Sequence, residues 1–184
     1  MVRVAATMRN ARLPFLVAAL VATVALASDE SELISSAQAT IATFKKTDPK
    51  IDKFFGSSVG YAVFPTIGKG GFVVGGAGGD GVLFVGGKPA GKASMGQASV
   101  GFQLGGQTFS EIIFFENAST LNDFKKGNFA LAAQASAVAL SAGAAAAANY
   151  EHGVAIFTAT KTGLMYEASV GGQKFGYKPF GASK

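Results

Sequence analysis

The 184-residue sequence contains no cysteine, no tryptophan and only one histidine, His152. Without cysteine, the chain must be stable without disulfide bonds. No Asp or Glu near His152 has the spacing of metal ligands, and neither a serine triad nor a Gly-x-Ser-x-Gly elbow is indicated. We therefore expect a protein that is not an enzyme and that has no metal and no cofactor. An enzymatic alternative would have to use Glu111 or His152.

The first 27 residues predict a cleavable secretory signal peptide. Three arginines without acidic residues precede the apolar run 13–26, and small residues occupy the −3 and −1 positions before Ser28. This apolar run is short for a membrane span. We expect an exported protein that resides in a bacterial periplasm. A peripheral position at a membrane and secretion are further options. An uncleaved N-terminal anchor is the alternative.

Removal of the signal peptide lowers the positive charge of the chain. The formal net charge is +5, and the loss of all three arginines leaves 13 lysines against 11 acidic residues. A nucleic-acid-binding protein needs a basic stripe, so nucleic acid is not an expected partner. The remaining 157 residues fit one domain with a hydrophobic core.

Residues 28–56 predict an N-terminal amphipathic helical segment. Apolar residues recur at helical spacing over 29–44, Asp29 and Glu32 have capping-box spacing, and Pro49 opens a second short turn. Lysines and aromatic residues gather at the end of this segment, and the candidate lipid-binding residues are Phe44, Lys45, Lys46, Lys50, Lys53 and Phe54. Such a cluster could bind an anionic membrane surface. The alternative is a solvated rim over a packed helix.

Residues 57–184 predict a β-rich core. Seventeen of the 25 glycines lie in 56–106, where they separate short apolar runs, as expected for antiparallel strands with tight turns. Asp80–Gly81 predicts a hairpin turn, and residues 87–92 predict a loop. The apolar run 109–115 predicts a strand buried on both faces. Glu111 lies inside this run, where we expect it at an edge or hydrogen-bonded, with a functional carboxylate as the alternative.

The remaining segments complete an α+β pattern. A short helix is predicted over 118–126. Alanine favours a helix over 128–148, although small residues at alternate positions also permit a strand. Residues 154–160 and 164–170 predict a hairpin that 171–177 extends.

Two glycine patterns resemble phosphate-binding loops, but neither is followed by the element that such a loop requires. The glycines 76, 78 and 81 match a dinucleotide-binding pattern, but the apolar run 82–85 predicts another strand and not a helix. Residues 86–92 resemble a P-loop, but Ala93 stands where a Ser or Thr would bind magnesium.

The segment GYAVFPTIGKGGFVVGGAGGDGVLF, residues 60–84, resembles the opening of the SYLF lipid-binding domain family. The resemblance continues through Ser94, the run 101–107, Glu111 and residues 118–124 to the late segment 160–171. It covers roughly residues 50 to 180, and the ordered series of glycines makes it specific.

The resemblance implies a single α+β domain with a curved, barrel-like antiparallel sheet and an N-terminal amphipathic helix. By this analogy residues 129–147 form a strand. Eukaryotic members bind phosphoinositides, some fungal members bind actin, and bacterial members are exported proteins of poorly defined role. Lipid contact is attributed to the basic N-terminal helix, which corresponds here to Phe44 and the four lysines. Asp48 and Asp52 lie among these lysines and weaken the correspondence.

These observations predict an exported, non-enzymatic protein that engages anionic phospholipid head groups or a membrane surface, by attraction of lysines and insertion of a few apolar groups. Because phosphoinositides are not normal bacterial lipids, a generic anionic phospholipid is the expected partner, and actin is not expected. The alternatives are a small outer-membrane β-barrel or a structural protein of the envelope.

Overall fold

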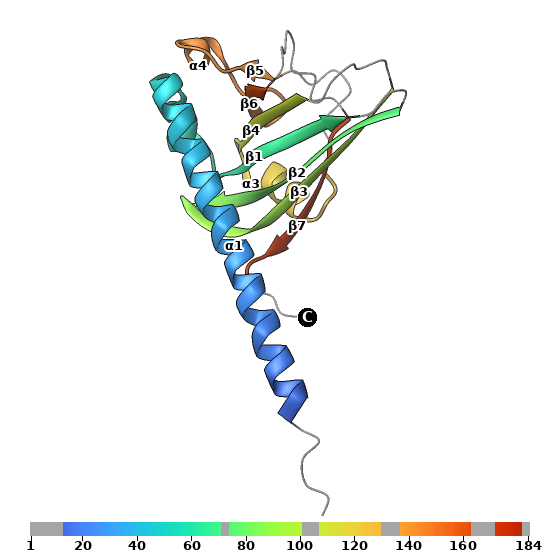
Figure 1. Ribbon diagram of the computed structural model, residues 1–184. Coiled ribbons are helices and arrows are strands. Elements are labelled where there is room, and N and C mark those ends of the chain that lie inside the picture. Colours follow the sequence, from blue (N-terminus) through green and yellow to red (C-terminus); the bar gives the residue numbers. More distant parts are fainter. Residues whose placement is uncertain (1–12, 71–73, 101–106, 130–136, 163–171, 182–184) are drawn as a thin grey trace, which may run out of the picture.

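The computed structural model describes residues 13–70, 74–100, 107–129, 137–162 and 172–181, and a seven-stranded sheet forms its centre (Figure 1). The strands are β1 (Gly60–Gly70), β2 (Val74–Val85), β3 (Lys88–Val100), β4 (Gln107–Phe115), β5 (Val138–Ala139), β6 (Val154–Thr162) and β7 (Lys174–Pro179). The helices are α1 (Leu13–Thr47), η1 (Pro49–Ile51), α2 (Asp52–Ser57), α3 (Ala118–Lys125) and α4 (Ala144–Ala147). The α+β fold predicted from the sequence is confirmed.

The strand order is β5-β6-β4-β1-β2-β3-β7, so the first hairpin and β4 form the middle of the sheet. All neighbouring strands are antiparallel except β5 and β6, which pair in parallel over two residues. Among the described residues the edges β5 and β7 do not pair with each other, so the sheet is open and the barrel is not closed.

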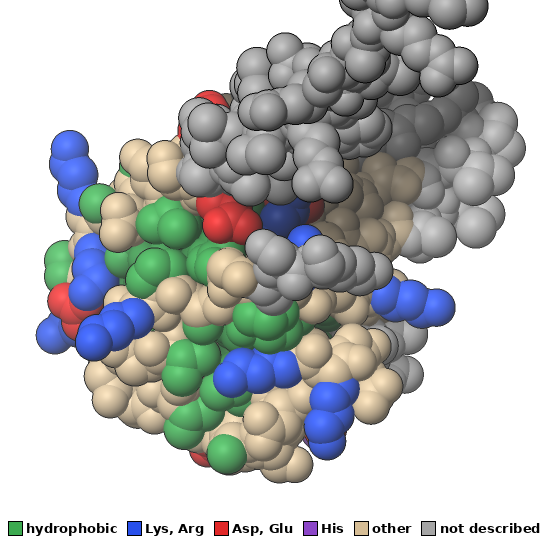
Figure 2. Space-filling view, turned by 90° about the horizontal axis from the view of Figure 1, so that it is seen from below, with side chains coloured by type: hydrophobic (Ala, Val, Ile, Leu, Met, Phe, Trp, Pro, Cys, Tyr) green, Lys and Arg blue, Asp and Glu red, His purple; other side chains and the backbone are tan. Residues whose placement is uncertain are grey.

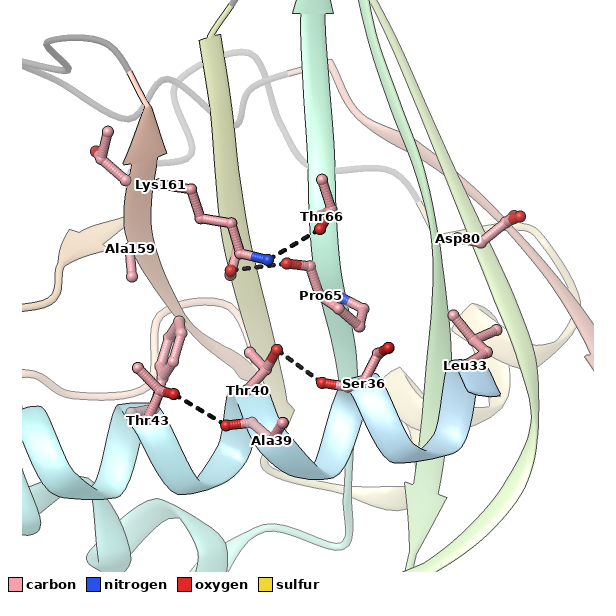
Figure 3. Close-up of a pocket in the computed structure, with 13 residues that line it drawn as sticks. Leu33, Ser36, Ala39, Thr40, Thr43, Pro65, Thr66, Asp80, Ala159 and Lys161 are labelled. Carbon is pink, nitrogen blue, oxygen red and sulfur yellow. Dashed lines mark hydrogen bonds between the residues drawn. The ribbon is translucent and has the colours of Figure 1, made fainter. Parts of the chain in front are cut away.

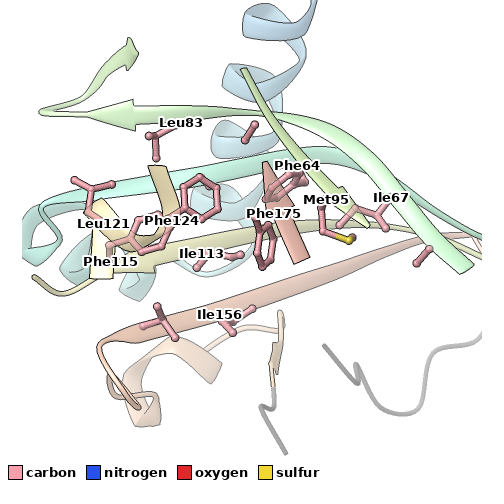
Figure 4. Packing of buried hydrophobic residues seen from close by; sticks show 14 of the residues in the cluster. Phe64, Ile67, Leu83, Met95, Ile113, Phe115, Leu121, Phe124, Ile156 and Phe175 are labelled. Atoms are coloured by element: carbon pink, nitrogen blue, oxygen red, sulfur yellow. The ribbon is translucent and has the colours of Figure 1, made fainter. Parts of the chain in front are cut away.

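Apolar residues alternate between the two faces of the sheet, so each face has its own core. On one face, Phe64, Leu83, Ile113 and other side chains pack against α3 (Figure 4). On the other face, Phe84, Phe114, Phe157 and their neighbours pack under α1, α2 and α4. Because β4 lies in the middle and contributes to both cores, its residues from Phe109 to Phe115 are all buried, as the continuous apolar run predicted.

The sheet curves strongly around the core beneath α3. The ring centroids of Phe64 in β1 and Phe175 in β7 lie 5.8 Å apart, although β2 and β3 separate these two strands in the sheet. In addition, Gln173, just before β7, donates a hydrogen bond from Nε2 to Glu111 Oε2 in β4 at 3.1 Å. These contacts across the concave face hold the β7 edge over the middle of the sheet.

We expect Gln173→Ala to lower the free energy of unfolding by about 1–3 kcal/mol, because it removes a hydrogen bond between two side chains that are both 0 % exposed. Hydrogen exchange of the β7 amides should accelerate at the same time. Lys174→Ala, which truncates the exposed neighbouring residue, is the control and should change little. Unchanged stability of Gln173→Ala would show that the buried bond does not hold the edge strand.

The turn between β2 and β3 differs from its prediction. Asp80 and Gly81 lie inside β2, and the chain reverses at Gly86 and Gly87, whose φ angles of 58° and 75° suit a two-residue hairpin turn. The predicted loop 87–92 is therefore mostly the start of β3. Gly81 serves close packing, since a Cβ atom there would meet the Val63 carbonyl oxygen and the Phe64 ring.

Helix α1 extends beyond its predicted limits of 29–44 in both directions. It crosses one face of the sheet, and its N-terminal part projects past the sheet edge (Figure 1). Asp29 therefore lies inside the helix and does not cap it. Among the described residues, no helix combines the length and the apolar character needed to cross a membrane.

The alanine-rich segment forms neither one long helix nor one long strand. Its described part contains the two-residue strand β5 and the four-residue helix α4, so the strand implied for 129–147 is confirmed only at Val138–Ala139. Residues 130–136 lie outside the described residues. The second half of the predicted hairpin, 164–170, also lies outside them. Residues 171–177 were predicted to extend this hairpin, whereas β7 pairs with β3.

Candidate functional site

The predicted lysine cluster lies where α1, η1 and α2 meet. Lys46 and Lys50 are exposed, and within the described part of the chain neither ammonium group forms a hydrogen bond or an ion pair. These two lysines are the members of the cluster that form no ion pair among the described residues, although the charge of Lys50 helps to lower the pKa of the Asp48 carboxyl group.

The other two lysines are held by intramolecular contacts. Lys45 Nζ forms an ion pair with Asp52 Oδ1 at 2.7 Å and lies 4.4 Å from the centre of the Phe55 ring. Lys53 Nζ donates hydrogen bonds to the backbone oxygens of Ala146 and Ala148 at 3.1 and 2.8 Å. Lys53 therefore binds the C-terminal end of α4, where a cation interacts favourably with free carbonyl groups.

The two aromatic residues of the predicted cluster are buried. Phe44 is 1 % exposed and Phe54 is 2 % exposed, and both belong to the core beneath α1 and α2. The amphipathic face recognised in the sequence is thus used for packing on the sheet. Neither ring can insert into a membrane unless this core opens.

Asp48 fixes the junction between α1, η1 and α4. Its Oδ1 accepts a hydrogen bond from Lys50 N at 3.1 Å, which caps η1, and its Oδ2 accepts one from Ala145 N at 2.7 Å. The Ala145 amide is the main cause that holds the pKa of Asp48 below its ordinary value of 3.8. The sequence suggested a carboxylate that competes with the lysines, whereas the structure places it in a buried, structural position.

Acid should weaken this junction. A carboxyl group whose pKa is lowered on folding stabilises the fold at pH values above its pKa in the unfolded state. This stabilisation is lost as the pH falls through the pKa of the group in the folded state. We expect wild-type stability to decline below about pH 5 more steeply than that of Asp48→Asn, which should be less stable at neutral pH. Urea unfolding at several pH values measures both slopes, and parallel slopes would contradict this role for Asp48.

An open groove of about 540 Å³ lies between α1 and the sheet (Figure 3). Its wall from α1 carries Leu33, Ala39, Phe44 and three hydroxyl residues, and its floor comes from β1, β2, β4 and β6. Lys161 of β6 reaches across the floor and donates from Nζ to Thr66 Oγ1 of β1 at 2.9 Å. Sequence reasoning missed this groove because its lining residues come from α1 and four strands that are distant in the sequence.

The remaining sequence candidates do not form a catalytic arrangement. His152 is exposed in the turn before β6, with a φ of 53°. Glu111 is buried on the opposite face of the sheet from α1. The described residues contain no group of three or more His, Asp or Glu side chains that could hold a metal ion. The two phosphate-loop patterns run through β2 and β3, so no helix begins after either of them.

The surface in Figure 2 shows lysines interspersed with apolar side chains rather than one continuous apolar patch. Val59, 38 % exposed, is the large hydrophobic side chain that stands exposed among the described residues.

Residues 96–177 match the family model described as Ysc84, Las17-binding protein actin regulator. The match runs from β3 to β7 and confirms the family resemblance noted in the sequence. It does not include α1, β1, β2 or the first part of β3, so the lysine cluster lies outside the matched range. A search of curated proteins gives no match to the chain.

Proposed function

Because this chain carries a domain of the SYLF (Ysc84) family, we propose that it is an exported, non-enzymatic protein that binds anionic phospholipid surfaces through the lysines at the α1–α2 junction. Family membership fits a lipid-binding or membrane-associated role. The observation that carries the assignment to this surface is the pair of exposed lysines, Lys46 and Lys50, which form no ion pair among the described residues.

The proposed mechanism is electrostatic attraction without aromatic insertion. A lysine near an anionic membrane contributes about 1 kcal/mol, so Lys46 and Lys50 together would contribute about 2 kcal/mol. Lys45 adds less because Asp52 neutralises it. Lys53 lies beside them, but its ammonium group is bound to α4. Since Phe44 and Phe54 are buried, their part in lipid binding is to position the lysines.

Co-sedimentation with vesicles tests this proposal. The protein should sediment with vesicles of phosphatidylcholine and phosphatidylglycerol, and binding should fall steeply as salt is raised from about 50 to 200 mM, because the Debye length shortens. Vesicles of phosphatidylcholine alone should leave the protein in solution. Equal binding to both vesicle types, or binding to neither, would refute the electrostatic mechanism.

Export is a separate part of the proposal, supported by the apolar run 13–26 and the small residues at its end. Expression of the full chain in a Gram-negative bacterium should give a mature form that begins at Ser28. Mass spectrometry of the osmotic-shock fraction measures this directly. A product that keeps residues 1–27 would support an N-terminal anchor instead.

The family description also names a protein-binding role, and this favours a second candidate function, docking of a protein partner. Within the matched residues 96–177, α3 and β7 contribute to the core on the face of the sheet opposite the lysine cluster. For an exported protein, actin is not an expected partner. Co-sedimentation with filamentous actin should therefore be negative, and a positive result would favour the protein-binding function over the lipid-binding one.

A further inference from the structure

The groove between α1 and the sheet has a floor shaped by an irregularity in β1. The pairing register of β1 shifts against β2 between Val63 and Gly68, and against β4 between Phe64 and Ile67. Both shifts span Pro65 and Thr66, which line the groove. The buried Ser110 hydroxyl donates to the Pro65 carbonyl at 2.8 Å, so a side chain stabilises the bulge. Bulges of this kind often lie next to functional sites.

Most of the wall that α1 contributes is built from short side chains, and Leu33 and Phe44 are its two large ones. Ser36, Ala39, Thr40 and Thr43 line the groove where leucine or phenylalanine would fill it. The hydroxyl groups of Thr40 and Thr43 donate to the α1 carbonyl oxygens of Ser36 and Ala39, at 2.9 and 3.0 Å. Their hydrogen atoms are therefore directed to the helix, which lowers the polarity of the wall. Leu33, Pro65 and Ala159 add apolar surface.

The charge of the groove is positive at its β6 side. Lys161 and Asp80 are the charged residues that line it, and Asp80 is neutralised by an ion pair with Lys92 at 2.8 Å. Lys161 forms no ion pair within the described ranges. Its hydrogen bond to Thr66 leaves two N–H groups of the ammonium for an anion.

We propose that this groove binds one single-chain anionic lipid, with the carboxylate or phosphate at Lys161 and Thr66 and the acyl chain along α1. A volume of about 540 Å³ lies in the range of roughly 300–1,000 Å³ typical of small-molecule sites. The wall combines apolar and hydroxyl side chains, and the Lys161 ammonium group forms no ion pair within the described ranges. Both features suit a negatively charged amphiphile. Neither Lys46 nor Lys50 lines this groove, so the site goes beyond the surface binding proposed above.

Calorimetric titration of the full chain with dodecanoate, below its critical micelle concentration, tests the proposal. Dodecanoate should bind, and 1-dodecanol should bind about tenfold more weakly because it lacks the charge. Octanoate should also bind more weakly, by up to about fourfold for each methylene group that leaves the groove. Amide signals of Thr66, Ala159 and Thr160 should shift in NMR spectra. Equal binding of dodecanol and dodecanoate would overturn the proposal.

Matched variants locate the site. Ala39→Phe fills the groove from an exposed position and should abolish dodecanoate binding, whereas Ala42→Phe, also exposed on α1 but outside the groove, should not. Lys161→Gln should weaken binding about tenfold, Lys161→Arg should retain it, and Lys126→Gln serves as the charge control. Undiminished binding by Ala39→Phe would place the lipid elsewhere.

The same titration separates this proposal from the surface proposal. Lys46→Gln/Lys50→Gln should bind dodecanoate as wild type does, whatever its effect on vesicles. Loss of dodecanoate binding in that double variant, with retention in Ala39→Phe, would assign the anion to the surface lysines and overturn the groove site.

Discussion

The Phe54→Ala variant is expected to lose about 3–5 kcal/mol of its free energy of unfolding. Phe54 is 2 % exposed, and its ring centroid lies 5.5, 5.3 and 5.0 Å from those of Phe114, Tyr150 and Phe157. These rings come from β4, the segment before β6, and β6 itself. Truncation would leave a cavity where α2 joins the sheet. Since domains of this size are stable by about 5–15 kcal/mol, the loss is a large fraction of the total.

Urea unfolding followed by circular dichroism measures this loss. Val59→Ala is the matched control, since Val59 lies close by in the sequence and is 38 % exposed; it should change stability by less than about 0.5 kcal/mol. The insertion hypothesis makes the opposite prediction for Phe54→Ala, namely full stability with reduced vesicle binding. That outcome would show that the ring reaches the membrane and does not form the core.

Several elements were predictable because local sequence alone determines them. The helix over 118–126 has Asn117 as a cap, whose Oδ1 accepts from Thr120 N at 3.0 Å, and it ends before Gly127. The strand over 109–115 was recognised by its continuous apolar run. The α+β class was predictable from the change of period between the N-terminal helix and the glycine-rich segment.

Other features depend on tertiary contacts that local patterns do not encode. Asp80–Gly81 is a common turn signal, but here Gly81 allows β1 to pass close to β2. The pairing of β7 with β3 depends on sheet curvature, which brings Phe175 to Phe64 and Gln173 to Glu111. Likewise, alanine favours a helix by propensity, but the described part of the alanine-rich segment forms only a two-residue strand and a four-residue helix among its neighbours in the fold.

The burial and contacts of the candidate site residues could be predicted only in part, for a related reason. An amphipathic helix has the same periodicity whether its apolar face packs on a sheet or enters a membrane. The sequence therefore assigned Phe44 and Phe54 to lipid contact, whereas both lie in the core. The contacts of Lys45 with Asp52 and of Lys53 with α4 also required the fold, and they single out Lys46 and Lys50.

The Lys46→Gln/Lys50→Gln variant is expected to bind anionic vesicles about 30-fold more weakly than wild type, because it removes about 2 kcal/mol of electrostatic attraction. Folding should be unaffected, since both side chains are exposed. Lys125→Gln/Lys126→Gln changes the net charge equally, but these residues lie at the end of α3, on the opposite face of the sheet. This control therefore separates the position of the charge from its amount.

Titration of both double variants and the wild type with phosphatidylglycerol vesicles tests whether the α1–α2 junction is the membrane-binding surface. We expect a dissociation constant about 30-fold higher for Lys46→Gln/Lys50→Gln and little change for Lys125→Gln/Lys126→Gln. Equal weakening of the two variants would mean that only net charge matters. Undiminished binding of Lys46→Gln/Lys50→Gln would contradict the assignment of the membrane-binding surface to the α1–α2 junction.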